Sequence, residues 1–123
     1  RDRYVHYADI YKKFIRPIFH TCKVYNHAPI TAHGGVESSG WFAMEYGARD
    51  RTKGWATFIR MGESDSDTFV FKPRGLDRGK TYKVTFDNTG ETAKVDGVRL
   101  MQEGLPIHLE AIMSSELLLF EAE

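Results

Sequence analysis

The feature that most constrains this chain is a change in the spacing of its apolar residues near Gly40. From Tyr4 to Ile18 the apolar residues recur at intervals of three and four, and after Gly40 apolar and polar residues alternate. An α-helix repeats about every 3.6 residues and a β-strand every second residue. The pattern therefore predicts a helical unit followed by a β unit.

The first unit is predicted to be one amphipathic helix. Its apolar residues share one face and are Tyr4, Tyr7, Ala8, Tyr11, Phe14, Ile15 and Ile18. Pro17 has no amide hydrogen and restricts the residue before it, so we expect the helix to end near Arg16. Burying one large apolar side chain is worth roughly 1.5–3 kcal/mol. We therefore expect the stripe to pack on the β unit or on a second copy of the chain; its aromatic members are Tyr4, Tyr7, Tyr11 and Phe14.

Residues 20–40 show no sustained period and are predicted to be an irregular connection. They include Asn26, Pro29 and the pair Gly34 and Gly35, which favour turns. Connections of about 20 residues are long for one compact domain. We therefore divide the chain into a helix with its linker over residues 1–40 and a β domain over residues 41–123.

The β domain is predicted to be a mainly β, antiparallel sandwich of about seven to eight strands with Greek-key connections. Alternation predicts strands at residues 41–46, 55–61, 68–72, 82–86, 91–95, 105–109 and 116–120. Short strands separated by turns every 8–12 residues or so are typical of this architecture. The run Asp87–Gly90 predicts a tight hairpin turn, and residues 97–103 predict one helical turn that stops at Gly104.

Composition excludes several classes of function. Lys and Arg number 17, as do Asp and Glu, so the net charge is zero and the basic surface of a nucleic-acid binder is not expected. No apolar run approaches the roughly 20 residues of a membrane-spanning helix. The single cysteine, Cys22, excludes an internal disulfide and leaves the cellular compartment undecided.

The sequence predicts neither a metal centre nor a cofactor. His20, Cys22 and His27 are closely spaced, with His33 a candidate fourth ligand, but they lack the paired spacing typical of zinc sites. Residues 62–67, GESDSD, carry three carboxylates without the other positions of a calcium loop. We therefore expect a partly buried thiol beside surface histidines in the first segment and a solvated hairpin tip in the second.

Catalytic residues are not expected in this chain either. It has no G-x-S-x-G nucleophile motif and no pairing of nucleophile and base. Gly75 and Gly79 lack the order of a phosphate-binding loop and are predicted to form a turn. Three aromatic residues, Trp41, Tyr46 and Trp55, have two interpretations, because flat rings can stack on sugars or fill the core of a sandwich.

Several ordered motifs in the second half resemble the C-terminal domain of family 36 glycoside hydrolases, the alpha-galactosidase or melibiase group. They are residues 54–60 (GWATFIR), 71–77 (FKPRGLD), 82–84 (YKV), 89–91 (TGE), 97–105 (GVRLMQEGL) and 115–121 (SELLLFE). Together the resemblance covers about residues 41–121.

This resemblance implies a small antiparallel sandwich that follows a (β/α)8 catalytic barrel. The barrel carries the two catalytic Asp residues, and neither of their motifs occurs in this chain. The chain is then a non-catalytic accessory domain that supports the barrel. Its helix would be the tail of that barrel, with Tyr4, Tyr7, Tyr11 and Phe14 facing the barrel or a second copy of the chain. The alternative is a carbohydrate-binding module that uses Trp41, Tyr46 and Trp55.

Overall fold

A computed structural model describes residues 2–27, 40–61 and 67–123, with the side chains of residues 2–4 excepted. The elements, in chain order, are α1 (Asp2–Ile10), η1 (Tyr11–Ile15), α2 (Arg16–Phe19), β1 (Lys23–Asn26), β2 (Trp41–Gly47), β3 (Lys53–Arg60), β4 (Thr68–Phe71), β5 (Thr81–Phe86), β6 (Glu91–Asp96), α3 (Gly97–Gln102), β7 (Leu105–His108) and β8 (Ser115–Ala122). Within this description the strands form two antiparallel sheets, in the orders β1-β2-β3-β8-β5-β6 and β4-β7.

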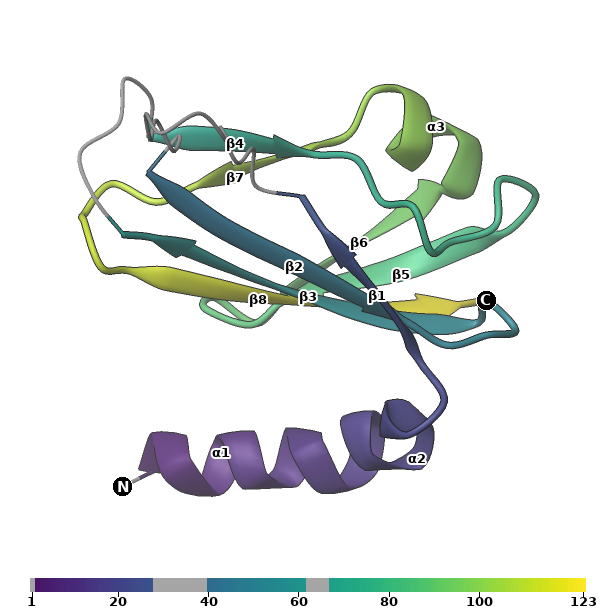
Figure 1. The fold of residues 1–123 in the computed structure, drawn as a ribbon, viewed down its shortest axis with the longest axis horizontal. Coiled ribbons are helices and arrows are strands. Elements are labelled where there is room, and N and C mark those ends of the chain that lie inside the picture. The colour runs from purple at the N-terminus through teal and green to yellow at the C-terminus, as the bar shows by residue number, and fades with distance from the viewer. Residues whose placement is uncertain (1, 28–39, 62–66) are drawn as a thin grey trace, which may run out of the picture.

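The core lies between the two sheets. The small sheet and α3 cover one face of the large sheet, and the helical segment lies below the other face (Figure 1). The largest fully buried core side chains are Phe58, Phe71, Leu76, Tyr82, Leu100, Leu118 and Phe120. Phe58 and Phe71 meet edge to face with their ring centroids 5.0 Å apart, which joins β3 to β4 across the core. The prediction of an antiparallel β-sandwich with a preceding helix is therefore confirmed.

The helical segment continues past the predicted end at Arg16 and stops at Phe19. The chain widens to a π-helical turn over η1, where the Arg16 amide donates to the carbonyl of Tyr11. Pro17 then falls in the first turn of α2, where a missing amide hydrogen costs no intrahelical bond. The predicted end was wrong because the change of helix type accommodates the proline.

The large sheet begins before residue 41, because Lys23–Asn26 forms the edge strand β1 within the segment predicted to be irregular. β1 pairs with β2 in a register that places Lys23 opposite Gly47. Three of its four side chains are exposed, so the strand has no buried face to produce an alternating pattern. Residues 28–39 of the predicted linker lie outside the described residues.

The other predicted strands occur within two residues of their expected bounds. The turn at Asp87–Gly90 forms, with Gly90 at φ 77°, and Gly104 ends the short α3 segment at φ 80°. None of the helices in the described ranges is both long enough and apolar enough to cross a membrane.

Candidate functional site

The helical segment is held against the outer face of the large sheet at two points. Phe14 is buried, and the Lys53 ammonium of β3 lies 5.1 Å from the centre of its ring. Toward the start of α1, His6 Nε2 lies 2.6 Å from Asp87 Oδ1, in the turn between β5 and β6. The Asp87 side chain is 7% exposed and that of His6 is 51% exposed, so the carboxylate end of this contact is the part shielded from water. These two contacts set where the helical segment lies.

The same segment carries four large apolar side chains that are each at least 39% exposed. We call Val5, Tyr7, Tyr11 and Phe19 the exposed helical face. Tyr11 is 42% exposed, and its ring lies 6.4 Å from that of Phe19 and 5.5 Å from the Arg16 guanidinium. Of the predicted stripe, Phe14 thus packs inward while Tyr7 and Tyr11 remain exposed. The side chain of Tyr4 lies outside the described residues.

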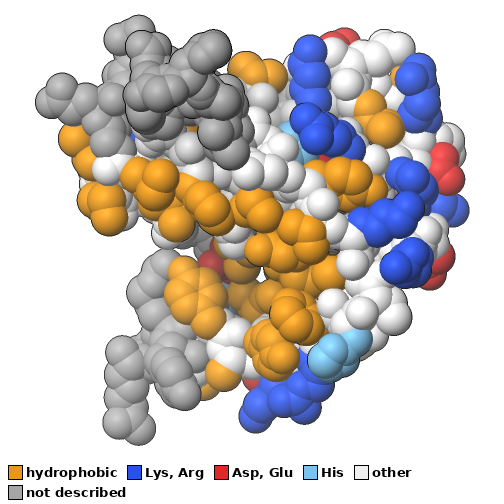
Figure 2. All heavy atoms as spheres, in the orientation of Figure 1, with side chains coloured by type: hydrophobic (Ala, Val, Ile, Leu, Met, Phe, Trp, Pro, Cys, Tyr) orange, Lys and Arg blue, Asp and Glu red, His pale blue; other side chains and the backbone are white. Residues whose placement is uncertain are grey.

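A hollow of about 340 Å³ separates α1 from the sheet. Its walls include Tyr7 and Ile10 on α1, Ile59 on β3 and Leu117 on β8. Figure 2 shows apolar side chains on the helical segment and on the sheet above it, with the hollow between them. Helix and sheet are therefore only partly packed on each other, and apolar surface continues from one to the other.

A buried carboxylate, Glu45 on β2, organises the opposite side of the large sheet. Glu45 is 2% exposed. One of its oxygens accepts hydrogen bonds from His27 Nε2 at 2.7 Å and the Arg74 amide at 2.8 Å, and the other accepts from the Gly75 amide at 2.8 Å. A buried charge is tolerated only when it is paired and hydrogen-bonded, which these three donors achieve. Glu45 thus ties the end of β1 to the segment that follows β4.

That segment, which we call the 72–80 loop, is also held from its far side by a tyrosine. The Tyr82 hydroxyl donates to the Arg51 carbonyl at 2.6 Å and accepts from the Asp77 amide at 2.7 Å. Arg51 in turn donates to the carbonyls of Arg74 and Leu76 at 3.3 and 3.1 Å. Burial raises the pKa of the Tyr82 phenol, so it stays protonated and able to donate. These side chains hold the loop by its backbone groups.

Sequence reasoning missed Glu45 and Arg51 as organising residues. The available signal was that Glu45 shares a side of its strand with Trp41 and Ala43, both of which face the core. A carboxylate at such a position needs buried donors. The sequence gives no comparable indication for Arg51. Its backbone has a positive φ of 63°, and its side chain binds carbonyls of the 72–80 loop, 23 and 25 residues away in sequence.

The three candidate sugar-stacking aromatics lie in two places. Trp41 is 4% exposed and packs in the core, 5.6 Å from the ring of Phe69. Trp55 is equally buried on the outer face of the sheet, where Tyr46 stacks on it at 4.9 Å with the ring planes 8° apart. Neither indole faces solvent, and only the half-buried Tyr46 has an accessible edge.

The candidate metal ligands do not converge. The Cys22 thiol donates to the Phe19 carbonyl at 3.2 Å, the His20 ring packs on Phe19, and His27 is paired with Glu45. Across the part of the chain that the structure describes, no three His, Cys, Asp or Glu side chains are grouped closely enough to hold a metal ion. His33 lies outside that part.

The acidic and glycine-containing turns also engage their own chain. Glu63 and Asp65 lie outside the described residues, and Asp67 lies 3.4 Å from His108 Nδ1. The Gly75 amide binds Glu45 and the Gly79 amide binds Asp77 Oδ1 at 2.8 Å. The backbone donors that a phosphate would use are thus already satisfied by carboxylates.

Comparisons with solved structures find the same fold in alpha-galactosidases. The enzyme from Lactobacillus brevis superposes with a TM-score of 0.75 at 17% identity, over 99% of this chain and 16% of its own. The family 36 enzyme from Geobacillus stearothermophilus gives a TM-score of 0.69 at 18% identity, over 94% of this chain and 15% of its own. The galactosidase domain of an alpha-galactosidase-sucrose kinase gives 0.67 at 15% identity, with the same coverage. This chain therefore spans about a sixth of the length of these proteins.

At the level of sequence, no curated protein matches the chain. A family model does match, over residues 41–120, and it describes the C-terminal domain of glycosyl hydrolase family 36. The matched range contains the whole of β2 to β7 and most of β8, together with Glu45 and the 72–80 loop. The chain belongs to the glycosyl hydrolase family 36 C-terminal domain family.

Proposed function

We propose that this chain serves as the non-catalytic accessory domain of an alpha-galactosidase-like glycoside hydrolase, in which it packs on the catalytic barrel and supports it. The observation that carries the proposal is the exposed helical face. Its four side chains are 39–59% exposed, in a segment that also packs on the sandwich through Phe14. Groups of large exposed apolar side chains on soluble proteins commonly mark an interaction surface.

The small share of the solved relatives that this fold occupies supports the same partner. In the solved relatives a chain segment of this fold occupies about a sixth of a longer polypeptide. A helix that lies between the sandwich and a preceding unit would contact both, with Phe14 on the sandwich and Tyr11 on the barrel. The barrel would supply the nucleophile and the general acid that retaining hydrolysis requires.

The test is hydrogen–deuterium exchange of the helical segment, measured in the isolated chain and in the longer polypeptide that carries it. We expect slower exchange of residues 5–19 in the longer polypeptide, because a covering surface excludes water and suppresses local opening. Tyr11→Ser should lower the thermal stability of the longer polypeptide while leaving that of the isolated chain nearly unchanged. Lys12→Ser, a change at an exposed neighbour in the same turn, is the matched control.

Two results would overturn the proposal. One is equal exchange in the isolated and the longer protein, and the other is an equal effect of Tyr11→Ser and Lys12→Ser. Concentration-dependent protection in the isolated chain would instead assign the exposed helical face to contact with a second copy of the chain.

A further inference from the structure

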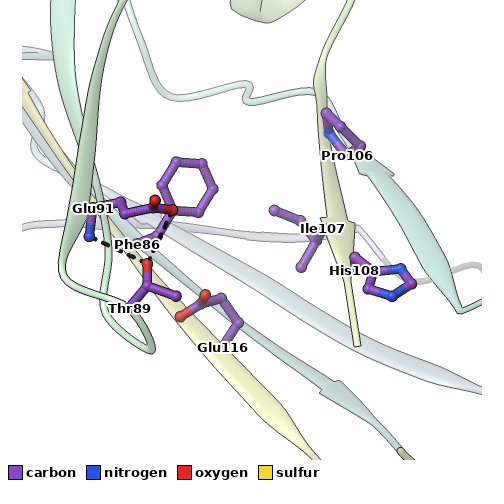
Figure 3. A pocket seen from close by; sticks show the side chains of 7 residues that line it. All are labelled: Phe86, Thr89, Glu91, Pro106, Ile107, His108 and Glu116. Atoms are coloured by element: carbon purple, nitrogen blue, oxygen red, sulfur yellow. Dashed lines mark hydrogen bonds between the residues drawn. The ribbon is translucent and has the colours of Figure 1, made fainter. Parts of the chain in front are cut away.

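A second hollow opens between the β5–β6 hairpin of the large sheet and β7 of the small sheet. It has a volume of about 230 Å³. We call it the hairpin cleft; it is lined by Phe86, Thr89, Glu91, Pro106, Ile107, His108 and Glu116. Figure 3 shows the hairpin residues on one side, the β7 residues on the other, and Glu116 of β8 between them. Residues of four strands, β5 to β8, thus border one small space.

The apolar wall of the cleft is preformed. Phe86 packs against the core cluster, and Ile107 is part of that cluster. Both side chains are therefore already ordered before a ligand binds. On the β7 side the Ile107 side chain points toward the hairpin, while those of Pro106 and His108 point away from it (Figure 3). Ligand sites commonly combine such walls with a few convergent polar groups, and preformed walls lower the cost of binding.

The polar groups of the cleft retain free hydrogen-bonding capacity. Glu116 Oε1 accepts from the amides of Asn88 and Leu117 at 3.0 and 2.9 Å, and these are the hydrogen bonds of its side chain among the described residues. Its second oxygen is therefore free to accept from a ligand. Glu91 is exposed, and within residues 2–27, 40–61 and 67–123 its carboxylate has one long contact, 3.4 Å from the Thr89 hydroxyl. Burial raises the pKa of the Glu116 carboxyl, as expected for a site screened from water.

We propose that the hairpin cleft binds one pyranose unit of an oligosaccharide. A pyranose combines an apolar ring face, which suits the Phe86 ring, with a rim of hydroxyl donors, which suit the free oxygens of Glu91 and Glu116. The volume suits a single monosaccharide and is below the range typical of drug-sized ligands. This site is separate from Trp41, Tyr46 and Trp55, and the binding does not depend on a barrel. Only the choice of galactosides as probes rests on the proposed function.

The experiment is a titration of the ¹⁵N-labelled chain with methyl α-D-galactoside and with raffinose, followed by amide chemical shifts. We expect saturable shifts confined to the cleft, at Thr89, Glu91, Ile107 and His108, with a dissociation constant in the millimolar range that suits so small a contact. Butylammonium serves as a cationic probe, because two carboxylates could instead attract a positive charge. Tighter binding of butylammonium than of either sugar would overturn the proposal.

Variants identify which groups carry the binding. Glu91→Gln and Phe86→Leu should each weaken sugar binding about tenfold, since one removes a charged acceptor and the other the flat ring. Glu103→Gln, an exposed carboxylate outside the cleft, should bind as the unchanged chain does. Shifts that do not saturate, shifts outside the cleft, or unchanged affinity in Glu91→Gln and Phe86→Leu would refute the site. Because the isolated chain is used, such a failure would leave the exchange test of barrel packing unaffected.

Discussion

Removal of the buried charge at Glu45 is the most informative single perturbation of this fold. Its carboxylate accepts three hydrogen bonds at 2.7–2.8 Å while 2% exposed. Breaking a buried, hydrogen-bonded charge typically costs about 3–5 kcal/mol, because the partners stay buried without an acceptor. We expect Glu45→Ala to lower the free energy of unfolding by about that amount. Glu45→Gln keeps one oxygen but points an amide donor at another donor, and should cost about 2–3 kcal/mol.

Urea denaturation followed by tryptophan fluorescence and by circular dichroism measures both changes. Glu103→Gln is the matched control, since it removes the same charge from an exposed pair with Arg99. Such surface pairs contribute about 0–1 kcal/mol, so the control should hardly shift the midpoint. A Glu45→Gln variant as stable as the Glu103→Gln variant would refute the view that Glu45 holds β1 and the 72–80 loop together.

Three further predictions concern the loop, the phenol and the helical segment. Gly97→Ala should lower the free energy of unfolding, measured in a thermal melt, by about 3 kcal/mol or more, because a Cβ there would overlap the Asp77 carbonyl. Gly79→Ala is the control, since its Cβ would meet only Asp77 Oδ1 at 3.5 Å, and it should change the free energy of unfolding by less than about 1 kcal/mol. Burial raises the pKa of Tyr82 above its ordinary 10.0, so the unfolded chain loses the phenol proton at a lower pH than the folded chain. The free energy of unfolding should therefore fall as pH rises past about 10. Alkaline denaturation curves measure this fall, and it should be absent from Tyr82→Phe. A chain that starts at residue 23 should still unfold cooperatively in urea, and its free energy of unfolding should fall by roughly 1.5–3 kcal/mol because the burial of Phe14 is lost. A chain that starts at residue 39 should be less stable than the chain that starts at residue 23. If either shortened chain is unfolded, the helical segment belongs to the core.

The sandwich could be predicted from sequence because most of its strands have one buried and one less buried face. In β2 the buried positions Trp41, Ala43 and Glu45 alternate with positions that are exposed or half-buried. A one-residue shift would exchange the two faces, so alternation determines both the strand and its orientation. The same reasoning correctly placed the turn at Asp87–Gly90, where positive φ demands glycine.

The parts that could not be predicted depend on partners distant in sequence. β1 forms through backbone pairing with β2, and its mostly exposed side chains leave no pattern. The π-helical turn lets the helical segment pass Pro17, and neither propensity nor period indicates it. The contact between His6 and Asp87 joins residues 81 positions apart, so local sequence contains no trace of it.

These long-range contacts also bear on the proposed packing of the helical segment on a barrel, because they fix the position of the segment. At its start, His6 is held by Asp87 at the β5–β6 turn. Beyond its end, the chain enters β1, and His27 after β1 is held by Glu45. A segment fixed at both ends loses less conformational entropy when a partner covers it, so more of the apolar contact energy remains as affinity. On this reasoning Glu45, on the far face of the sheet from the helix, would contribute to the proposed docking of the exposed helical face without touching the partner.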